Sequence, residues 1–329
     1  METLLIGRSD VRRLLPMRDG IEAVERAFRL LGEGRASPPG TLAVPAREGA
    51  FHIKAGVLEL GRSWYAAKSN GNFPLNPARN GLPTIQGVMV LADAADGRVL
   101  AVLDSMELTA LRTAAATAVA AKHLARSDAR VATIWGCGVQ GRAQLRALAA
   151  VLPLERVHAQ DRDARAASSF ASALSAELGL EVVVTADPVA AVRSSDVCVT
   201  CTTSREFILG ADCLHEGLFM AGVGVDHPEK RELAPELLAG AKLVVDGLDQ
   251  CAAIGDLRHA LEAGVVARSD VHAELGAVVA GRAEGRVSAS EAIVFDSTGI
   301  ALQDVAAAAV VYERALAEGR GVRSMAFDE

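Results

Sequence analysis

The sequence predicts an α/β protein in which a Rossmann-type, doubly wound parallel sheet is joined to a discontinuous α+β domain. Three observations carry this prediction. From residue 131 onward, short apolar segments alternate with helical segments, the pattern of a parallel sheet with helices on both faces. A glycine-rich turn joins the first apolar segment to a helix. Before residue 104, strand-like pieces follow one another with few helices between them, which indicates a domain with antiparallel or mixed pairing.

Length and composition narrow the class of protein. The chain has 329 residues, room for two domains, and half of them are hydrophobic, so a sizeable core can form. A net charge of −7 argues against a nucleic-acid or anionic-membrane partner. No apolar run is long enough to span a bilayer, and the N-terminus has no signal-peptide pattern. Five cysteines without zinc-like spacing favour a reduced, cytoplasmic protein with no bound metal.

The first part of the chain combines one amphipathic helix with several strands. The helix covers residues 21–34 and is expected to end at Ser37-Pro38-Pro39-Gly40. Strand-like pieces follow near 41–45, 50–54, 64–69 and 86–92. Asp104 and Glu107 have the spacing of a capping box, and a long Ala-rich helix is expected from there to about Leu124.

The pattern of the second part predicts a parallel sheet. Apolar strands alternate with helices and are expected at 131–135, 156–160, 181–185, 196–201, 218–223, 243–246 and 292–296. The last helix, 300–318, is expected to pack back on the first domain, which makes that domain discontinuous.

A G-x-G-x-x-G turn indicates a dinucleotide site. Gly136 permits a tight turn, Gly138 lets a pyrophosphate approach the backbone, and Gly141 lets the helix pack close to the strand. Asp161 ends the next strand, near the spacing of a ribose 2′-OH acceptor, which favours NAD. A glycine-rich turn without a ligand is the alternative. Further residues expected to contact the cofactor, most of them at strand ends, are Val139, Gln140, Arg162, Thr202, Thr203, Val225 and Ser297.

Arg112 is a candidate substrate ligand because its helix face is otherwise apolar. Leu108, Ala115 and Val119 lie on the same face, so the guanidinium should be buried and should need an anion. Either a substrate carboxylate or an internal acidic residue can supply that anion.

Other candidate substrate residues lie on strands. Lys68 shares a face with Ala66 and Trp64, so it could bind a carboxylate or alter the reactivity of an imine. Without other evidence, the interpretation would be a solvated lysine at a strand end. His52 and Lys54 share the face opposite Phe51 and Ile53, as a polar pair facing away from the core, and are weighed as possible substrate ligands.

Asp226 follows the apolar strand 218–223, at the edge of the sheet where ligands bind in such folds. Its carboxylate can accept a proton or hold an ammonium group. The alternative is a turn-forming aspartate before His227-Pro228.

Four segments together resemble the ornithine cyclodeaminase/mu-crystallin family over nearly the whole chain. They are residues 76–87 (NPARNGLPTIQG), 108–115 (LTALRTAA), 136–141 (GCGVQG) and 296–304 (DSTGIALQD). The resemblance implies an NAD-binding Rossmann domain at 114–299 and a substrate-binding and dimerisation domain at 1–113 and 300–329. It also implies a homodimer and chemistry at the Cα of an amino acid through an imine.

The resemblance also assigns residue roles. Lys68 and Arg112 match carboxylate-binding residues, Asp226 matches a catalytic aspartate near the substrate amine, and Asp161 matches the ribose acceptor of NAD-preferring members. The expected activity is that of an NAD-dependent amino acid dehydrogenase or imine reductase. An ornithine-type cyclodeaminase and a non-catalytic, crystallin-like NAD(P)H-binding protein are the alternatives.

Two positions depart from the family pattern. Gly40 stands where the family usually has an arginine that binds the carboxylate, and Lys54 stands where many members have Met. We infer that Lys54 replaces the missing cation. His52 aligns with a glutamate that acts on the substrate in cyclodeaminase, which argues against ornithine cyclisation.

Overall fold

The computed structural model describes residues 2–37, 39–319 and 321–326 and divides into two compact units. The first unit comprises Met1–Arg112 and Ile300–Glu329, and the second comprises Thr113–Gly299. The described residues leave out 1, 38, 320 and 327–329. Residue 38 belongs to the Pro-Pro segment, and all of these positions fall within the expected domains. The predicted α/β class with a Rossmann-type sheet is confirmed. Within the described part of the chain, no helix is long and apolar enough to cross a membrane.

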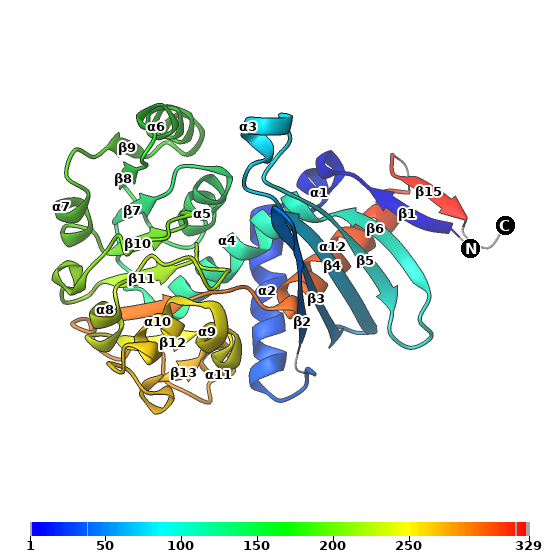
Figure 1. Ribbon diagram of the computed structural model, residues 1–329. Coiled ribbons are helices and arrows are strands. Elements are labelled where there is room, and N and C mark those ends of the chain that lie inside the picture. The colour runs from blue at the N-terminus through cyan, green and yellow to red at the C-terminus, as the bar shows by residue number, and fades with distance from the viewer. Residues whose placement is uncertain (1, 38, 320, 327–329) are drawn as a thin grey trace. The chain divides into compact units, whose positions relative to one another are not determined.

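The second unit is built on an eight-stranded sheet in which every pairing is parallel. In spatial order its strands are β13 (Ala273–Glu274), β12 (Lys242–Val245), β14 (Ile293–Asp296), β11 (Phe219–Gly222), β10 (Val197–Thr200), β7 (Val131–Trp135), β8 (Arg156–Gln160) and β9 (Glu181–Val184) (Figure 1). The seven strands expected here are present, with ends shifted by at most two residues. Because β8 and β9 continue from β7 on one side and β10 follows on the other, the strand order reverses between β7 and β10.

Helices connect these strands. They are α5 (Val139–Ala149), α6 (Ala164–Leu178), α7 (Pro188–Arg193), α8 (Pro235–Ala239), α9 (Leu248–Ile254), α10 (Asp256–Glu262) and α11 (Leu275–Val279), with short 3-10 turns η1 (Ala211–Cys213) and η2 (Arg268–Asp270). Helix α4 (Ser105–Leu124) precedes β7. The expected cap is present, since the Asp104 carboxylate accepts from the backbone N–H of Glu107 at 2.8 Å.

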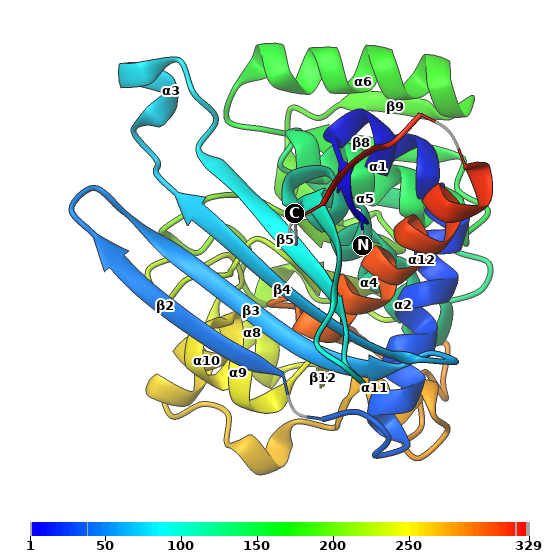
Figure 2. The ribbon, with the colours of Figure 1, turned by 90° about the vertical axis from the view of Figure 1, so that its right-hand side faces the viewer.

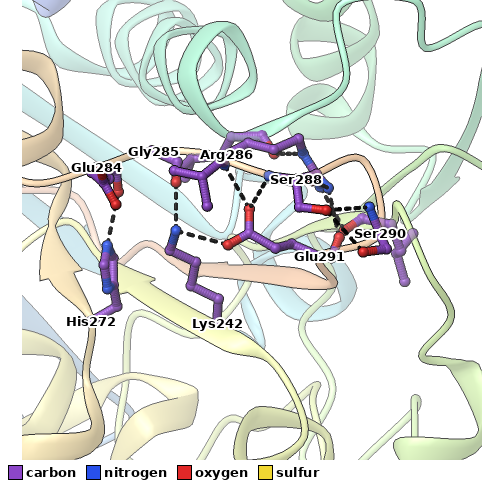
Figure 3. A network of polar contacts seen from close by, with 11 residues as sticks. Lys242, His272, Glu284, Gly285, Arg286, Ser288, Ser290 and Glu291 are labelled. Atoms are coloured by element: carbon purple, nitrogen blue, oxygen red, sulfur yellow. Dashed lines mark hydrogen bonds and ion pairs between the residues drawn. The ribbon is translucent and has the colours of Figure 1, made fainter.

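A polar network closes the amino edge of this sheet (Figure 3). Arg286 donates to the carbonyl oxygens of Leu124, Leu218 and Glu291. Lys242, the first residue of β12, forms an ion pair with Glu291 at 3.0 Å. These bonds satisfy backbone carbonyls just before β11 and β14 and at the end of α4. Ligands of such sheets bind at the opposite end, where the strands have their carboxyl ends.

The first unit is built on a seven-stranded sheet. In spatial order its strands are β15 (Arg323–Ala326), β1 (Glu2–Ile6), β6 (Val99–Asp104), β5 (Ile85–Asp93), β4 (Ser63–Asn72), β3 (Gly49–Glu59) and β2 (Gly40–Ala46). Only the β1–β6 pair is parallel. Figure 2 shows β2 to β5 as long strands lying side by side. The helices of this unit are α1 (Arg8–Leu14), α2 (Met17–Gly32), α3 (Asn76–Asn80) and α12 (Ala301–Glu318).

The helix and strand bounds expected for this unit need correction or addition. The amphipathic helix covers Met17–Gly32 rather than 21–34, because Gly34 adopts a φ of 72° and ends the helical conformation. Strands β1, β6 and β15 were not expected, and the four expected strands are longer than the apolar pieces that indicated them. Helix α12 packs on β3, β4 and α2 of the same unit, as expected for the last helix.

The expectation that His52 and Lys54 face away from the core is wrong. Residues of even number in β3 face α12, since a Cβ added at Gly56 would lie 3.1 Å from Leu302 of that helix. Phe51 lies on the opposite, open face and is 44% exposed. Strand alternation separates the two faces of a strand, but it does not say which one a helix covers.

Candidate cofactor and substrate sites

The glycine-rich loop of the second unit has the geometry of a pyrophosphate cradle. Gly136 adopts a φ of 107°, and a Cβ there would lie 2.8 Å from the carbonyl oxygen of Cys201. A Cβ at Gly141 would collide with the carbonyl oxygen of Gly136, so only glycine permits this approach of α5 to β7. A Cβ at Gly138 would meet nothing within 4 Å, which leaves this backbone open to a ligand at the start of α5.

Asp161 is fixed beside this loop. One carboxylate oxygen accepts from the N–H of Cys137 at 2.7 Å, and the other accepts from the N–H of Asp163 at 2.9 Å. The carboxylate is therefore held at the end of β8, where it can accept hydrogen bonds from ribose hydroxyls.

A cavity of about 660 Å³ opens at the carboxyl ends of β7, β8 and β10, where the strand order reverses. Among the predicted cofactor residues, its lining includes Gly136, Gly138, Asp161, Arg162, Thr202 and Thr203. Sequence reasoning missed the other lining residues, which are Trp135, Cys201, Ser204, Arg205, Glu206 and Ile208. The position of this cavity and its open glycine backbone fit a dinucleotide.

The remaining predicted cofactor residues do not line this cavity. Val225 is buried, and Val139 and Gln140 form the first turn of α5. The Ser297 hydroxyl donates to Asp246 at 3.1 Å, and the backbone N–H of Gly299 donates to the same carboxylate at 2.6 Å. Ser297 therefore serves to fix the segment that follows β14.

Glu232, which sequence reasoning missed, joins the ends of two central strands. Its carboxylate accepts from the Thr200 hydroxyl at 2.8 Å and from the backbone N–H groups of Thr202 and Gly224 at 2.5 and 2.9 Å. The side chain is fully buried, and burial raises its pKa. Glu232 thereby holds a cavity-lining segment and the loop that carries Asp226 in one arrangement.

Asp226 lies in the loop after β11, with its side chain 46% exposed. Lys230 forms an ion pair with it at 2.6 Å. The carbonyl oxygen of Lys230 is within 2.9 Å of His259 Nε2, which anchors the lysine from α10. The pair keeps the carboxylate oriented at the carboxyl edge of the sheet.

In the first unit, Lys68 and Arg112 converge on a single carboxylate, that of Asp304 in α12. Lys68 Nζ lies 2.8 and 3.0 Å from the two Asp304 oxygens, and Arg112 Nε lies 2.8 Å from one of them. All three side chains are buried. The internal ion pair considered for Arg112 is thus present, yet one carboxylate balances only one of the two cations.

The charges of these side chains shift one another's pKa values. Burial, and then the charge of Arg112, lowers the pKa of Lys68 to about 7. Burial acts to raise the pKa of Asp304, but the charges of Arg112 and Lys68 outweigh it and lower that pKa. Arg112 also donates from Nη1 to Gln303 Oε1 at 2.7 Å, which fixes the plane of the guanidinium.

Lys54 and His52 lie next to this cluster in the sheet. Lys54 pairs directly with Lys68, and His52 pairs with Asn70. The charge of Lys54 contributes to the lowered pKa values of both Lys68 and Asp304. The sequence-based candidates His52, Lys54, Lys68 and Arg112 therefore gather on the helix-facing side of one sheet.

Residues 1–319 match the Ornithine cyclodeaminase/mu-crystallin family. The chain belongs to this family. A solved archaeal alanine dehydrogenase dimer with bound NAD is 39% identical, with a TM-score of 0.94 over 99% of this chain and 100% of that one.

Two further solved relatives are similar over their whole length. The Δ1-pyrroline-2-carboxylate reductase of Thermococcus litoralis, solved with NADH and L-proline, is 34% identical with a TM-score of 0.92 over 98% of this chain and 100% of that one. The iminosuccinate reductase of Paracoccus denitrificans, solved with NAD+, is 32% identical with a TM-score of 0.90 over 99% and 100%.

Proposed function

We propose that this member of the family is an NAD-dependent oxidoreductase that acts at the Cα of a small amino acid or its imine. The observation that carries the proposal is the buried pair of cations, Lys68 and Arg112, held by one carboxylate that cannot neutralise both. Retaining such a pair inside a protein is costly unless a further anion joins it. The relatives named above, an amino acid dehydrogenase and two imine reductases, support the same class of reaction.

In this proposal Lys68 and Arg112 bind the substrate α-carboxylate. The guanidinium fork matches a carboxylate in two hydrogen bonds, which fixes the orientation of Cα. Asp226 holds or accepts the proton at the substrate nitrogen. Bound NAD supplies the hydride acceptor, and its reduced form supplies the donor for the reverse reaction.

The second unit would hold NAD. Gly136 and Gly138 would accommodate the pyrophosphate against the start of α5, and Asp161 would accept from the ribose hydroxyls. Thr202 and Thr203 line the same cavity. A carboxylate at the ribose repels a 2′-phosphate, so NAD should be preferred to NADP.

The test is a two-way panel. L-amino acids are supplied with NAD, and 2-keto acids are supplied with ammonia or methylamine and NADH, while absorbance at 340 nm is followed. Net formation or consumption of NADH supports the proposal. Ammonia release from L-ornithine or L-lysine with no net change in NADH would instead identify a cyclodeaminase. Tight NADH binding without any turnover would indicate a binding protein.

We further propose that the protein forms a homodimer through the open face of the first unit's sheet. That face exposes large apolar side chains from neighbouring strands, namely Leu42, Val44, Phe51 and Val88. A contiguous apolar surface of this kind marks an association site. A second copy is the chosen partner because a relative of 39% identity is a dimer.

A further inference from the structure

Two loops of the second unit follow neighbouring strands of its sheet. Residues 202–208 come after β10, and most of them line the nucleotide cavity, so we call them the cavity loop. Residues 224–232 come after β11 and include Asp226, so we call them the aspartate loop. Because β10 and β11 are adjacent and parallel, the two loops leave the sheet at the same edge.

Phe207 of the cavity loop contacts two residues of other segments. The guanidinium carbon of Arg231, in the aspartate loop, lies 5.4 Å from the centre of the Phe207 ring, which is the geometry of a cation–π contact. The His259 ring of α10 meets Phe207 edge to face, with ring centres 5.8 Å apart and an angle of 72 + 13 = 85° replaced by the measured 85° between the planes. Both contacts depend on the charge distribution of an aromatic ring, so an aliphatic side chain at this position would not reproduce them.

These contacts fix the main chain of Lys230. His259 Nε2 lies 2.9 Å from the Lys230 carbonyl oxygen, which can only accept, so the His259 ring donates this hydrogen bond. Arg231 is the next residue along the chain, and its backbone N–H donates to the Ser204 carbonyl oxygen of the cavity loop at 3.1 Å. Lys230 is thereby held by one residue that bonds to it and by one that follows it, and Phe207 packs on both.

Lys230 in turn orients the carboxylate of Asp226. Its Nζ lies 2.6 Å from Asp226 Oδ1, and the Lys230 side chain is only 17% exposed, whereas that of Asp226 is 46% exposed. An ion pair at a surface orients a carboxylate only where its partner is itself held in place, because two mobile side chains lose entropy when they pair. The connection from Phe207 to Asp226 therefore runs through the main chain and then the side chain of Lys230.

We propose that Phe207 is a positioning residue for the reaction, because it holds Lys230, and through Lys230 the Asp226 carboxylate, in place relative to the cavity loop. This inference rests on the proposed function, in which Asp226 holds or accepts the proton at the substrate nitrogen. It accounts for an aromatic side chain that remains 39% exposed. Phe207 contacts neither the substrate nor the reacting atoms, so its loss should slow turnover without preventing NADH binding.

The experiment is a double-mutant cycle on kcat, run with a substrate that the panel of amino and keto acids identifies. Phe207→Leu keeps an apolar side chain but removes the ring, and Phe207→Tyr keeps the ring. Lys230→Met removes the ammonium group that pairs with Asp226. Val287→Ala, which truncates an exposed apolar side chain in the loop before β14, is the matched control. The NADH dissociation constant of each variant is measured by energy transfer from Trp135.

Phe207→Leu should lower kcat about tenfold, because it loses a cation–π contact and an aromatic pair, and should change the NADH dissociation constant by less than about twofold. Phe207→Tyr should keep most of the wild-type kcat, and Val287→Ala should change neither constant. Phe207→Leu with Lys230→Met should be no slower than Lys230→Met alone, since both changes disturb the same carboxylate. Independent, additive losses would overturn the proposal, and so would an equal loss of kcat and NADH affinity in Phe207→Leu.

Hydrogen–deuterium exchange of the full-length protein separates this inference from the proposed function, because it needs no turnover. Peptides that cover residues 226–231 should exchange about threefold faster in Phe207→Leu than in the wild type, while peptides from α6 should not change. Unchanged exchange at 226–231 would overturn the role of Phe207 even in an active oxidoreductase. Faster exchange there, in a protein that turns over no member of the substrate panel, would support the connection from Phe207 to the aspartate loop and contradict the oxidoreductase.

Discussion

Arg112 shows how one side chain can be both an internal ion-pair partner and a candidate ligand. Arg112→Ala should reduce kcat/KM by two to three orders of magnitude, because losing one side of a desolvated charge pair costs about 2–5 kcal/mol. NADH binding should be retained, since Arg112 lies in the first unit and the glycine loop in the second. Trp135 lines the nucleotide cavity, so its energy transfer to NADH reports cofactor binding directly. Loss of both activity and NADH binding, together with a lower melting temperature, would identify Arg112 as purely structural.

Asp161 should determine the choice between cofactors. Asp161→Ser removes the carboxylate that repels a 2′-phosphate, so kcat/KM with NADP should rise relative to that with NAD. Arg162 lines the same cavity and can pair with the phosphate, so the double substitution Asp161→Ser with Arg162→Ala should lose most of the gain. Steady-state kinetics with both cofactors provide the measurement. A wild type that uses NADP as efficiently as NAD would contradict the assignment.

Single residues were predictable from sequence where the local pattern carried their environment. The burial of Arg112 followed from its apolar helix face, and the tight turn at Gly136 and the close helix packing at Gly141 followed from a strand–turn–helix pattern. Asp304 could not be found this way, because it is 192 positions from Arg112 and nothing local marks it as a partner. Glu232 was missed for the same reason, since its partners belong to other strands.

The segment from β11 to α8 depends on Glu232 to hold its loop in place. In Glu232→Gln, the side chain loses one acceptor oxygen and presents N–H donors to backbone N–H groups. Leaving a buried donor unpaired costs about 1–3 kcal/mol, so the NADH dissociation constant should rise and the melting temperature should fall. Glu236→Gln, an exposed substitution four residues further along, should change neither. Unaltered NADH binding in Glu232→Gln would show that the carboxylate does not position the cavity.

Elements differed in how clearly the sequence marked them. Most strands of the second unit are short, continuous apolar runs between helices. Seven of the eight were predicted to within one residue at each end, as members of a parallel sheet, and the two-residue strand β13 was missed. In the first unit, β3 and β4 extend beyond the expected strand pieces, because polar residues such as Glu59 and Asn70 continue the pairing. The prediction of which face of that sheet lies against the core was wrong. The open face carries Phe51 and other large apolar side chains, which are typical of a core.

The two units should respond to pH in opposite directions. In the second unit, burial raises the pKa of Asp296 to about 7, above its value of roughly 4 in an unfolded chain. The folded state therefore keeps a proton that the unfolded state releases, so stability falls as pH rises from about 4 to 7. In the first unit, the pKa of Lys68 is lowered to about 7 from roughly 10.5, so stability rises with pH between those values.

Thermal melts from pH 5 to pH 10 measure both effects. Asp296→Asn should remove up to about 1.4 kcal/mol per pH unit of the slope below pH 7. Lys68→Met should flatten the slope above pH 7 and leave the lower range unchanged. A melting temperature that does not vary with pH in the wild type would contradict both assignments.

The exposed apolar side chains of the first unit predict that the protein forms a dimer. Val44 and Phe51 pair across β2 and β3 on the open face, both more than 40% exposed, so a charge placed at either position would be buried in the proposed dimer without a partner. Phe51→Asp should therefore shift the protein from dimer to monomer in light scattering coupled to size exclusion. Leu316→Asp is the matched control, because Leu316 is 54% exposed but lies on α12, which covers the other face of the sheet. A monomeric wild type would contradict the proposed dimer. A Phe51→Asp variant that remains dimeric while Leu316→Asp dissociates would place the interface elsewhere. Circular dichroism of the Phe51→Asp monomer distinguishes loss of assembly from loss of folding, since an exposed position should tolerate the aspartate once the partner is absent.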